Sequence, residues 1–169
     1  MKTRTGFVSN SSSSSFIISF NKDPSIRENL VEEMGDCSVA GDGDWHDSLT
    51  ADEVIDTIHA MVMNQLPATV DDLFEEFEST LSWDLYNRHE VLGRDGRYNG
   101  SNGRVDWALK QKAVDADMAI ELAPVVEKFK RDNQDKFVYI LEFSDSGSEY
   151  SFHQGEPFNN LTYKVVSHH

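Results

Sequence analysis

The sequence has a single cysteine, Cys37, among 169 residues. One cysteine can form neither a disulfide within the chain nor a zinc site built from several thiolates. A chain without disulfides is typical of a reducing compartment, so we expect a cytoplasmic protein.

The sequence also has few basic residues and no long apolar run. Fifteen lysines and arginines stand against thirty aspartates and glutamates, which gives a formal net charge of −15. A surface of that sign opposes nonspecific binding to nucleic acid or anionic membranes. The apolar segment Phe16–Phe20 is five residues long, too short to span a bilayer or to serve as a signal peptide. These features favour a protein partner over nucleic acid, with no membrane association, and no motif indicates a cofactor.

Aromatic residues, by contrast, are abundant, and several lie in strand-like runs. Segment 16–20 is β-branched and aromatic, which predicts a strand. Three further strand-like runs cover 136–143, 149–153 and 161–167, and the glycine and serines of 144–148 predict a hairpin turn between the first two.

Helical patterns occupy the middle of the chain. Capping-box spacings at Ser25/Glu28 and Thr50/Glu53, and a cap at Thr69, predict where the first three helices begin. Pro124 is expected to kink or split the fourth helix. The predicted helices cover residues 26–34, 51–66, 70–92 and 105–132.

Strand, helices and strands in that order predict an α+β fold. We expect a small antiparallel sheet, formed by the N-terminal strand and a C-terminal meander, packed against about four helices. One domain is predicted over residues 1–169, with a serine-rich loop and strand at 1–21, a helical section at 25–133 and C-terminal strands at 136–169. The N-terminal strand should join the C-terminal ones because its backbone groups need partners.

The N-terminal string GFVSNSSSSSF, residues 6–16, carries a resemblance to known proteins. It resembles the N-terminus of uncharacterised small proteins from tailed bacteriophages and some bacteria. The segments at 139–158 and 163–169 are similar to the ends of the same proteins. The resemblance implies a phage-type protein, located in the host cytoplasm or in the virion, and it implies no catalytic residue.

The run Ser11–Ser15 has three interpretations. The favoured one is a polar loop between two strands, with hydroxyls bonded to the backbone. The second is an anion cradle formed by Ser11, Ser12 and Ser13 near Lys2 and Arg4. The third is phosphorylation of exposed serines.

An acidic loop partly matches a calcium-binding pattern. Asp42, Asp44 and Glu53 stand at positions 1, 3 and 12 of such a loop. However, Asp47 occupies the position of the required glycine, and Thr50 and Glu53 already have a capping role. An ordinary acidic loop is favoured, and Asp42, Asp44 and Glu53 are weak metal candidates.

The glycine-rich loop 93–104 lies in a locally basic segment. Residues 88–112 hold six lysines and arginines and three acids, against the acidic balance elsewhere. Arg94, Arg97 and Arg104, with Tyr98 and Trp107, have the composition of an anion or single-stranded nucleic-acid site. The alternative, which the prevalence of solvated surface charge favours, is a loop whose arginines pair with the acidic helix before it.

The predicted helix 70–92 carries acidic side chains opposite its apolar stripe. Asp71, Asp72, Glu75 and Glu76 are predicted to form a face that binds a basic protein. The sequence as a whole therefore favours an acidic, non-catalytic, phage-type protein that binds another protein, with a host-encoded protein as one candidate partner. The alternatives are a minor virion component, or an anion- or nucleic-acid-binding protein that uses loop 93–104.

Overall fold

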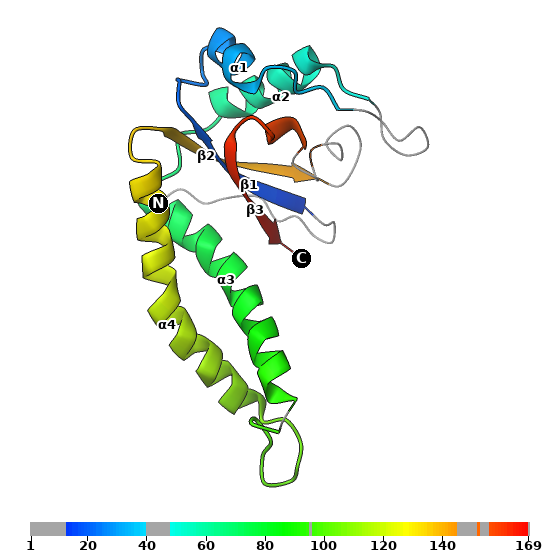
Figure 1. The fold of residues 1–169 in the computed structure, drawn as a ribbon, viewed down its shortest axis with the longest axis vertical. Helices are drawn as coiled ribbons and strands as arrows, with labels where there is room; N and C mark the ends of the chain where they lie inside the picture. The colour runs from blue at the N-terminus through cyan, green and yellow to red at the C-terminus, as the bar shows by residue number, and fades with distance from the viewer. Residues whose placement is uncertain (1–12, 40–47, 95, 145–151, 153–155, 169) are drawn as a thin grey trace. The chain divides into compact units, whose positions relative to one another are not determined.

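The computed structural model describes residues 13–39, 48–94, 96–144, 152 and 156–168. These residues contain four α-helices and a three-stranded antiparallel sheet, so the predicted α+β class is confirmed (Figure 1). In chain order the elements are β1 (Ser13–Phe20), α1 (Arg27–Met34), α2 (Ala51–Met63), α3 (Val70–Gly93), α4 (Trp107–Asp132), β2 (Phe137–Ser144), a 3₁₀ turn (Glu156–Phe158) and β3 (Thr162–His168).

The N-terminal strand lies in the middle of the sheet, whose order is β2-β1-β3. Phe16 is opposite Leu141 on one side and Val165 on the other, and both pairings are antiparallel. The expected pairing of N- and C-terminal strands is therefore confirmed. The two C-terminal strands do not form the expected meander, because β1 lies between them and its backbone is paired along both edges. Of the expected middle strand 149–153 only Phe152 is described, in a 3₁₀ turn, and the hairpin turn 145–148 lies outside the described residues.

The strand begins inside the serine run. Ser13, Ser14 and Ser15 belong to β1 and pair with β2, so the loop interpretation is wrong for these three residues. Ser11 and Ser12 lie outside the described part of the chain. Pairing with two neighbouring strands overrides the weak strand preference of serine, because it satisfies the backbone on both sides.

The chain divides into two compact units, and the sheet belongs to the first, residues 1–67 with 135–169. Alternate residues of β1 (Phe16, Ile18 and Phe20) are fully buried in a core with side chains of α1 and α2. Phe16 lies 5.7 Å from Phe143 and 5.1 Å from Phe158 between ring centroids. The prediction that residues 1–169 form one domain stays a prediction.

Helix α1 ends as predicted but begins differently. Gly35 ends it with a φ of 62°, a conformation that favours glycine. The N-cap is Ile26, without a side-chain hydrogen bond, so the predicted Ser25/Glu28 capping box is wrong. The Ser25 hydroxyl donates instead to Asp23, 2.7 Å away, in a local turn that competes with capping.

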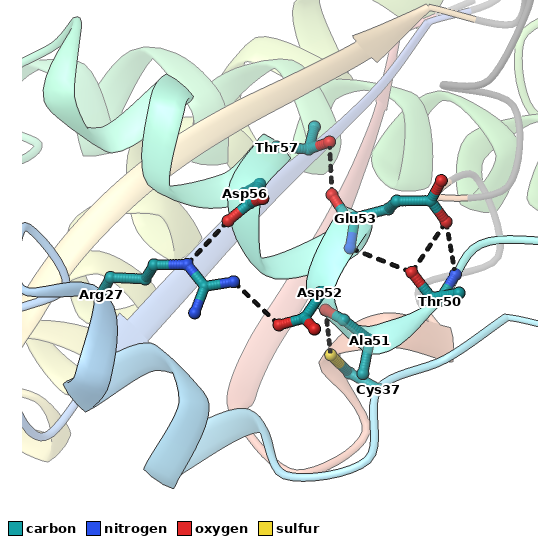
Figure 2. Close-up of polar contacts among 8 residues, drawn as sticks. All are labelled: Arg27, Cys37, Thr50, Ala51, Asp52, Glu53, Asp56 and Thr57. Atoms are coloured by element: carbon teal, nitrogen blue, oxygen red, sulfur yellow. Dashed lines mark hydrogen bonds and ion pairs between the residues drawn. The ribbon is translucent and has the colours of Figure 1, made fainter.

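Helix α2 begins with the predicted capping box (Figure 2). The Thr50 hydroxyl accepts from the Glu53 amide, and the Glu53 carboxylate accepts from the Thr50 amide at 2.8 Å. The latter bond is the main cause that lowers the pKa of Glu53. Arg27 of α1 bridges Asp52 and Asp56 of α2, at 2.8 and 2.7 Å, and so ties the two helices together.

Residues 68–134 form the second unit, in which α3 packs along α4 (Figure 1). Thr69 caps α3 as predicted, with Asp72 completing the box. Leu73, Phe77 and Leu85 of α3 and Val114 and Val126 of α4 are buried. Pro124 does not split α4. Proline has no N–H, so the Ile120 carbonyl lacks its helical donor. Both residues are exposed, so water can solvate that carbonyl.

We predict that Phe16→Ala lowers the free energy of unfolding of the sheet unit by about 3–5 kcal/mol, because it removes a fully buried ring and leaves a cavity. Val165→Ala is the control on the neighbouring strand, since Val165 is 40% exposed and should cost under about 1 kcal/mol. Urea unfolding followed by far-ultraviolet circular dichroism measures both. Equal losses in the two variants would contradict the described core.

Candidate functional site

A pocket of about 280 Å³ lies at the end of the second unit where α3 meets α4. This volume is close to the lower end of the range of small-molecule sites, about 300–1,000 Å³. Its lining comes from the last turns of α3, the glycine-rich loop and the first turn of α4: His89, Glu90, Gly93, Arg94, Tyr98, Val105, Trp107 and Lys110.

The glycine-rich loop is held by backbone hydrogen bonds that position Tyr98. Gly96 and Gly103 have φ values of 84° and 73°, which other residues rarely adopt. The Asp106 amide donates to the Tyr98 carbonyl at 2.7 Å, and Asn99 and Val105 form an isolated bridge. Asp106 then caps α4 by accepting from the amides of Ala108 and Leu109. Trp107 therefore enters the pocket wall as the first residue of α4.

His89 is 5% exposed and has a partner on each ring nitrogen. Nε2 lies 3.0 Å from an Asp117 carboxylate oxygen, and Nδ1 is hydrogen-bonded to the Tyr98 hydroxyl. An ionised carboxylate only accepts, so Nε2 carries the proton in the neutral ring and Nδ1 accepts from Tyr98. The three side chains form a chain of hydrogen bonds from α4 to the pocket wall.

Lys110 is a nearly buried cation, with 4% of its side chain exposed. Its ammonium lies 3.6 Å from the ring centroid of Tyr86 and 5.5 Å from that of Trp107. Such cation–π contacts stabilise a desolvated ammonium. A carboxylate oxygen of Glu90 is 3.8 Å from this ammonium, which is too far for a hydrogen bond. The N–H donors of Lys110 therefore make no hydrogen bond to Glu90.

Only part of the predicted basic site reaches this pocket. Arg94, Tyr98 and Trp107 line it, whereas Arg97 and Arg104 are exposed and outside the lining. Ser11 and Ser12 lie outside the described residues, as does the side chain of Ser13.

Sequence reasoning did not select His89 or Lys110. The three-residue spacing of Trp107 and Lys110 places them one helical turn apart and was a usable signal. The pairing of His89 with Asp117, 28 residues along the chain, has no local signature.

Only two of the four side chains in the predicted acidic face of α3 are exposed. Asp71 and Glu75 are exposed, but Asp72 is half-buried in the capping box, and Glu76 is 3% exposed. The prediction of Glu76 as an exposed partner-binding residue is wrong, because it lies one turn after buried Leu73 and beside buried Phe77. Asp72 is occupied by its structural role, so a charge reversal there would disturb the helix start.

The weak match to a calcium loop falls mostly outside the described residues. Asp42 and Asp44 lie outside the described residues, and Glu53 belongs to the α2 capping box. Within the described ranges, no group of three or more histidine, cysteine, aspartate or glutamate side chains is placed to hold a metal ion.

No protein-family model, curated protein or solved structure matches the chain. The resemblance to phage proteins therefore stays a prediction. Among the described helices, none is both long enough and apolar enough to cross a bilayer.

We predict that Tyr98→Phe lowers the free energy of unfolding of the second unit by about 1–3 kcal/mol, because it leaves the buried Nδ1 of His89 without its donor. Tyr86→Phe is the matched control: it removes a tyrosine hydroxyl from the same unit and keeps the ring under Lys110. Urea unfolding followed by tryptophan fluorescence, in a Trp45→Phe background that leaves only Trp83 and Trp107, reports on this unit. A loss of stability no larger than that of the control would contradict the His89–Tyr98 bond.

Proposed function

We propose that the protein is a binding protein whose pocket at the end of α3 and α4 holds a small anion attached to a planar ring, such as a nucleotide. One observation carries the proposal: the nearly buried ammonium of Lys110 shares the pocket wall with the exposed indole of Trp107. A cation and an aromatic face in one pocket suit the phosphate and the base of a nucleotide, respectively.

The charges of the lining favour an anion. Lys110 and Arg94 are cations, Glu90 is the carboxylate among the described lining residues, and His89 is neutral when its Nδ1 accepts from Tyr98. This local excess of positive charge exists in a chain of net charge −15. In a partly desolvated pocket a cation attracts an anion more strongly than on an open surface.

The aromatic contribution comes from Trp107, which is 62% exposed. An exposed indole beside a pocket offers a face on which a planar ring of a ligand can stack. Stacking of a base on an aromatic side chain contributes about 1–3 kcal/mol to binding. Trp107 therefore supplies both affinity and a fluorescent signal for binding.

We predict that adenosine 5′-monophosphate quenches tryptophan fluorescence and binds more tightly than either adenosine or inorganic phosphate, each of which offers half of the contact. Lys110→Met should weaken binding tenfold or more, equivalent to about 1.4 kcal/mol. Lys112→Met is the matched control, because Lys112 is exposed on the same helix and outside the lining. Absence of binding at millimolar nucleotide, or equal weakening in both variants, would refute the proposal.

The same titration separates a free nucleotide from a nucleic-acid strand. A single-stranded oligonucleotide has many phosphates, and its affinity falls steeply with salt. The pocket holds room for about one nucleotide, so we expect an oligonucleotide to gain little over the mononucleotide. An affinity gain of a hundredfold would instead identify single-stranded nucleic acid as the ligand.

A second candidate is the docking of a basic, host-encoded protein on the acidic start of α3. It is supported by the exposure of Asp71 and Glu75 together with the net charge of −15. If this candidate is right, the protein is of the phage type and acts in the host cytoplasm or in the virion.

For the second candidate we predict that a protein retained from bacterial lysate is released by salt, because exposed charges are screened within about 10 Å at 0.1 M. The double variant Asp71→Lys/Glu75→Lys should lose that protein, whereas Arg94→Ala should retain it. Loss with Arg94→Ala alone would assign the interaction to the pocket.

A further inference from the structure

We propose that anion binding in this pocket is coupled to the uptake of one proton by His89, and that the Tyr98 hydroxyl responds by turning its own O–H from His89 to the ligand. The inference rests on the proposed function of the pocket and adds how binding there is regulated.

The neutral state of His89 determines where the Tyr98 proton points. Asp117 accepts from Nε2, so Nδ1 has only a lone pair to offer, and the Tyr98 hydroxyl donates to it. The phenol oxygen then has only lone pairs for other partners. Toward an anion in the pocket, lone pairs give a repulsive contact.

Protonation of His89 reverses this hydrogen bond. A proton from solvent forms an Nδ1–H bond, and the imidazolium donates to Tyr98 while Nε2 still donates to Asp117. The Tyr98 oxygen now accepts, so its own proton must turn to another acceptor. An anion in the pocket is such an acceptor, and the added positive charge attracts it as well. No covalent bond breaks in the protein.

The charged groups around His89 make this step depend on the ligand. Asp117 on α4 and Glu90 on α3 favour the imidazolium, whereas Lys110 and Arg94 in the same pocket oppose it. Asp117 also acts on Arg88 of α3, which is held by Glu121 of α4 at 2.6 Å and whose pKa is raised chiefly by that bond. A bound anion offsets the positive charges of Lys110 and Arg94, so these charges no longer oppose the protonation of His89. By thermodynamic linkage, the proton then raises the affinity for the anion by the same factor.

The test is isothermal titration calorimetry of the full chain with adenosine 5′-monophosphate, near pH 7.5, in buffers of different ionisation enthalpy. The phosphate, with a second pKa near 6, is then almost fully ionised. The dependence of the observed heat on the buffer gives the number of protons taken up. We expect an uptake between about 0.3 and 1 proton, and an affinity that falls by up to tenfold per pH unit from about pH 7 to 8, where the phosphate stays ionised and histidine loses its charge.

Three variants assign the proton. His89→Gln should bind with no proton uptake, and Tyr98→Phe should lose most of the pH dependence of affinity although His89 is present. His59→Gln is the control, since His59 contacts the Ser25 carbonyl in the other unit and should behave as the wild type. If His89→Gln does not fold, the pH profile of Tyr98→Phe decides.

The outcomes separate the two proposals. Binding without proton uptake, uptake unchanged in His89→Gln, or a full pH dependence in Tyr98→Phe would overturn the coupling and leave the pocket's binding function intact. Failure of the nucleotide to bind at any pH would overturn the proposed function itself, and the coupling with it.

Discussion

The pairing of β1 with strands from the other end of the chain is the interaction on which the first unit depends. Phe16 meets Leu141 and Val165 across the two ladders, so the aromatic core forms only when residues from both ends have come together. Arg27 and the capped start of α2 are local, but the buried face they cover belongs to this sheet. Residues 68–134 lie between the two sequence halves of this unit and form their own compact unit. Long-range pairing of this kind predicts slow folding relative to the helical unit, whose contacts are closer in sequence.

Sequence predicted best what local chemistry decides. The caps at Thr50 and Thr69 and the stop at Gly35 depend on neighbours within four residues, and the sequence predicts all three. Serine was misread twice for the same reason, that its hydroxyl has several local uses. At Ser25 it bonds Asp23 instead of capping α1, and at Ser13–Ser15 the two partner strands impose an extended backbone. The strand order was also beyond local reasoning, because alternation in a strand does not say how many neighbours it has.

The candidate site shows the same limit. Composition drew attention to Arg94, Tyr98 and Trp107, which do line the pocket, but it also selected Arg97 and Arg104, which do not. The composition of a glycine-rich loop does not say which of its basic side chains line a pocket and which face solvent. Glu76 shows the converse error: helical periodicity predicts that it is a surface carboxylate, and the structure buries it. A two-helix unit buries different sides of α3 at its two ends, so one straight stripe does not describe the whole helix.

The position of Lys110 argues for a role beyond stability. A buried ammonium is costly unless it is paired and hydrogen-bonded. A purely structural lysine would be best served by a carboxylate at hydrogen-bond distance, yet Glu90 is 3.8 Å away and the ammonium lies over the face of Tyr86. The rings of Tyr86 and Trp107 hold the charge in place without using the directional N–H donors that an anion needs. His89 is arranged in a similar way, with both nitrogens occupied but one bond, to Tyr98, able to reverse when a proton arrives. Both groups are thus fixed in position while part of their hydrogen-bonding capacity remains for a ligand, which is the property expected of a preorganised binding site.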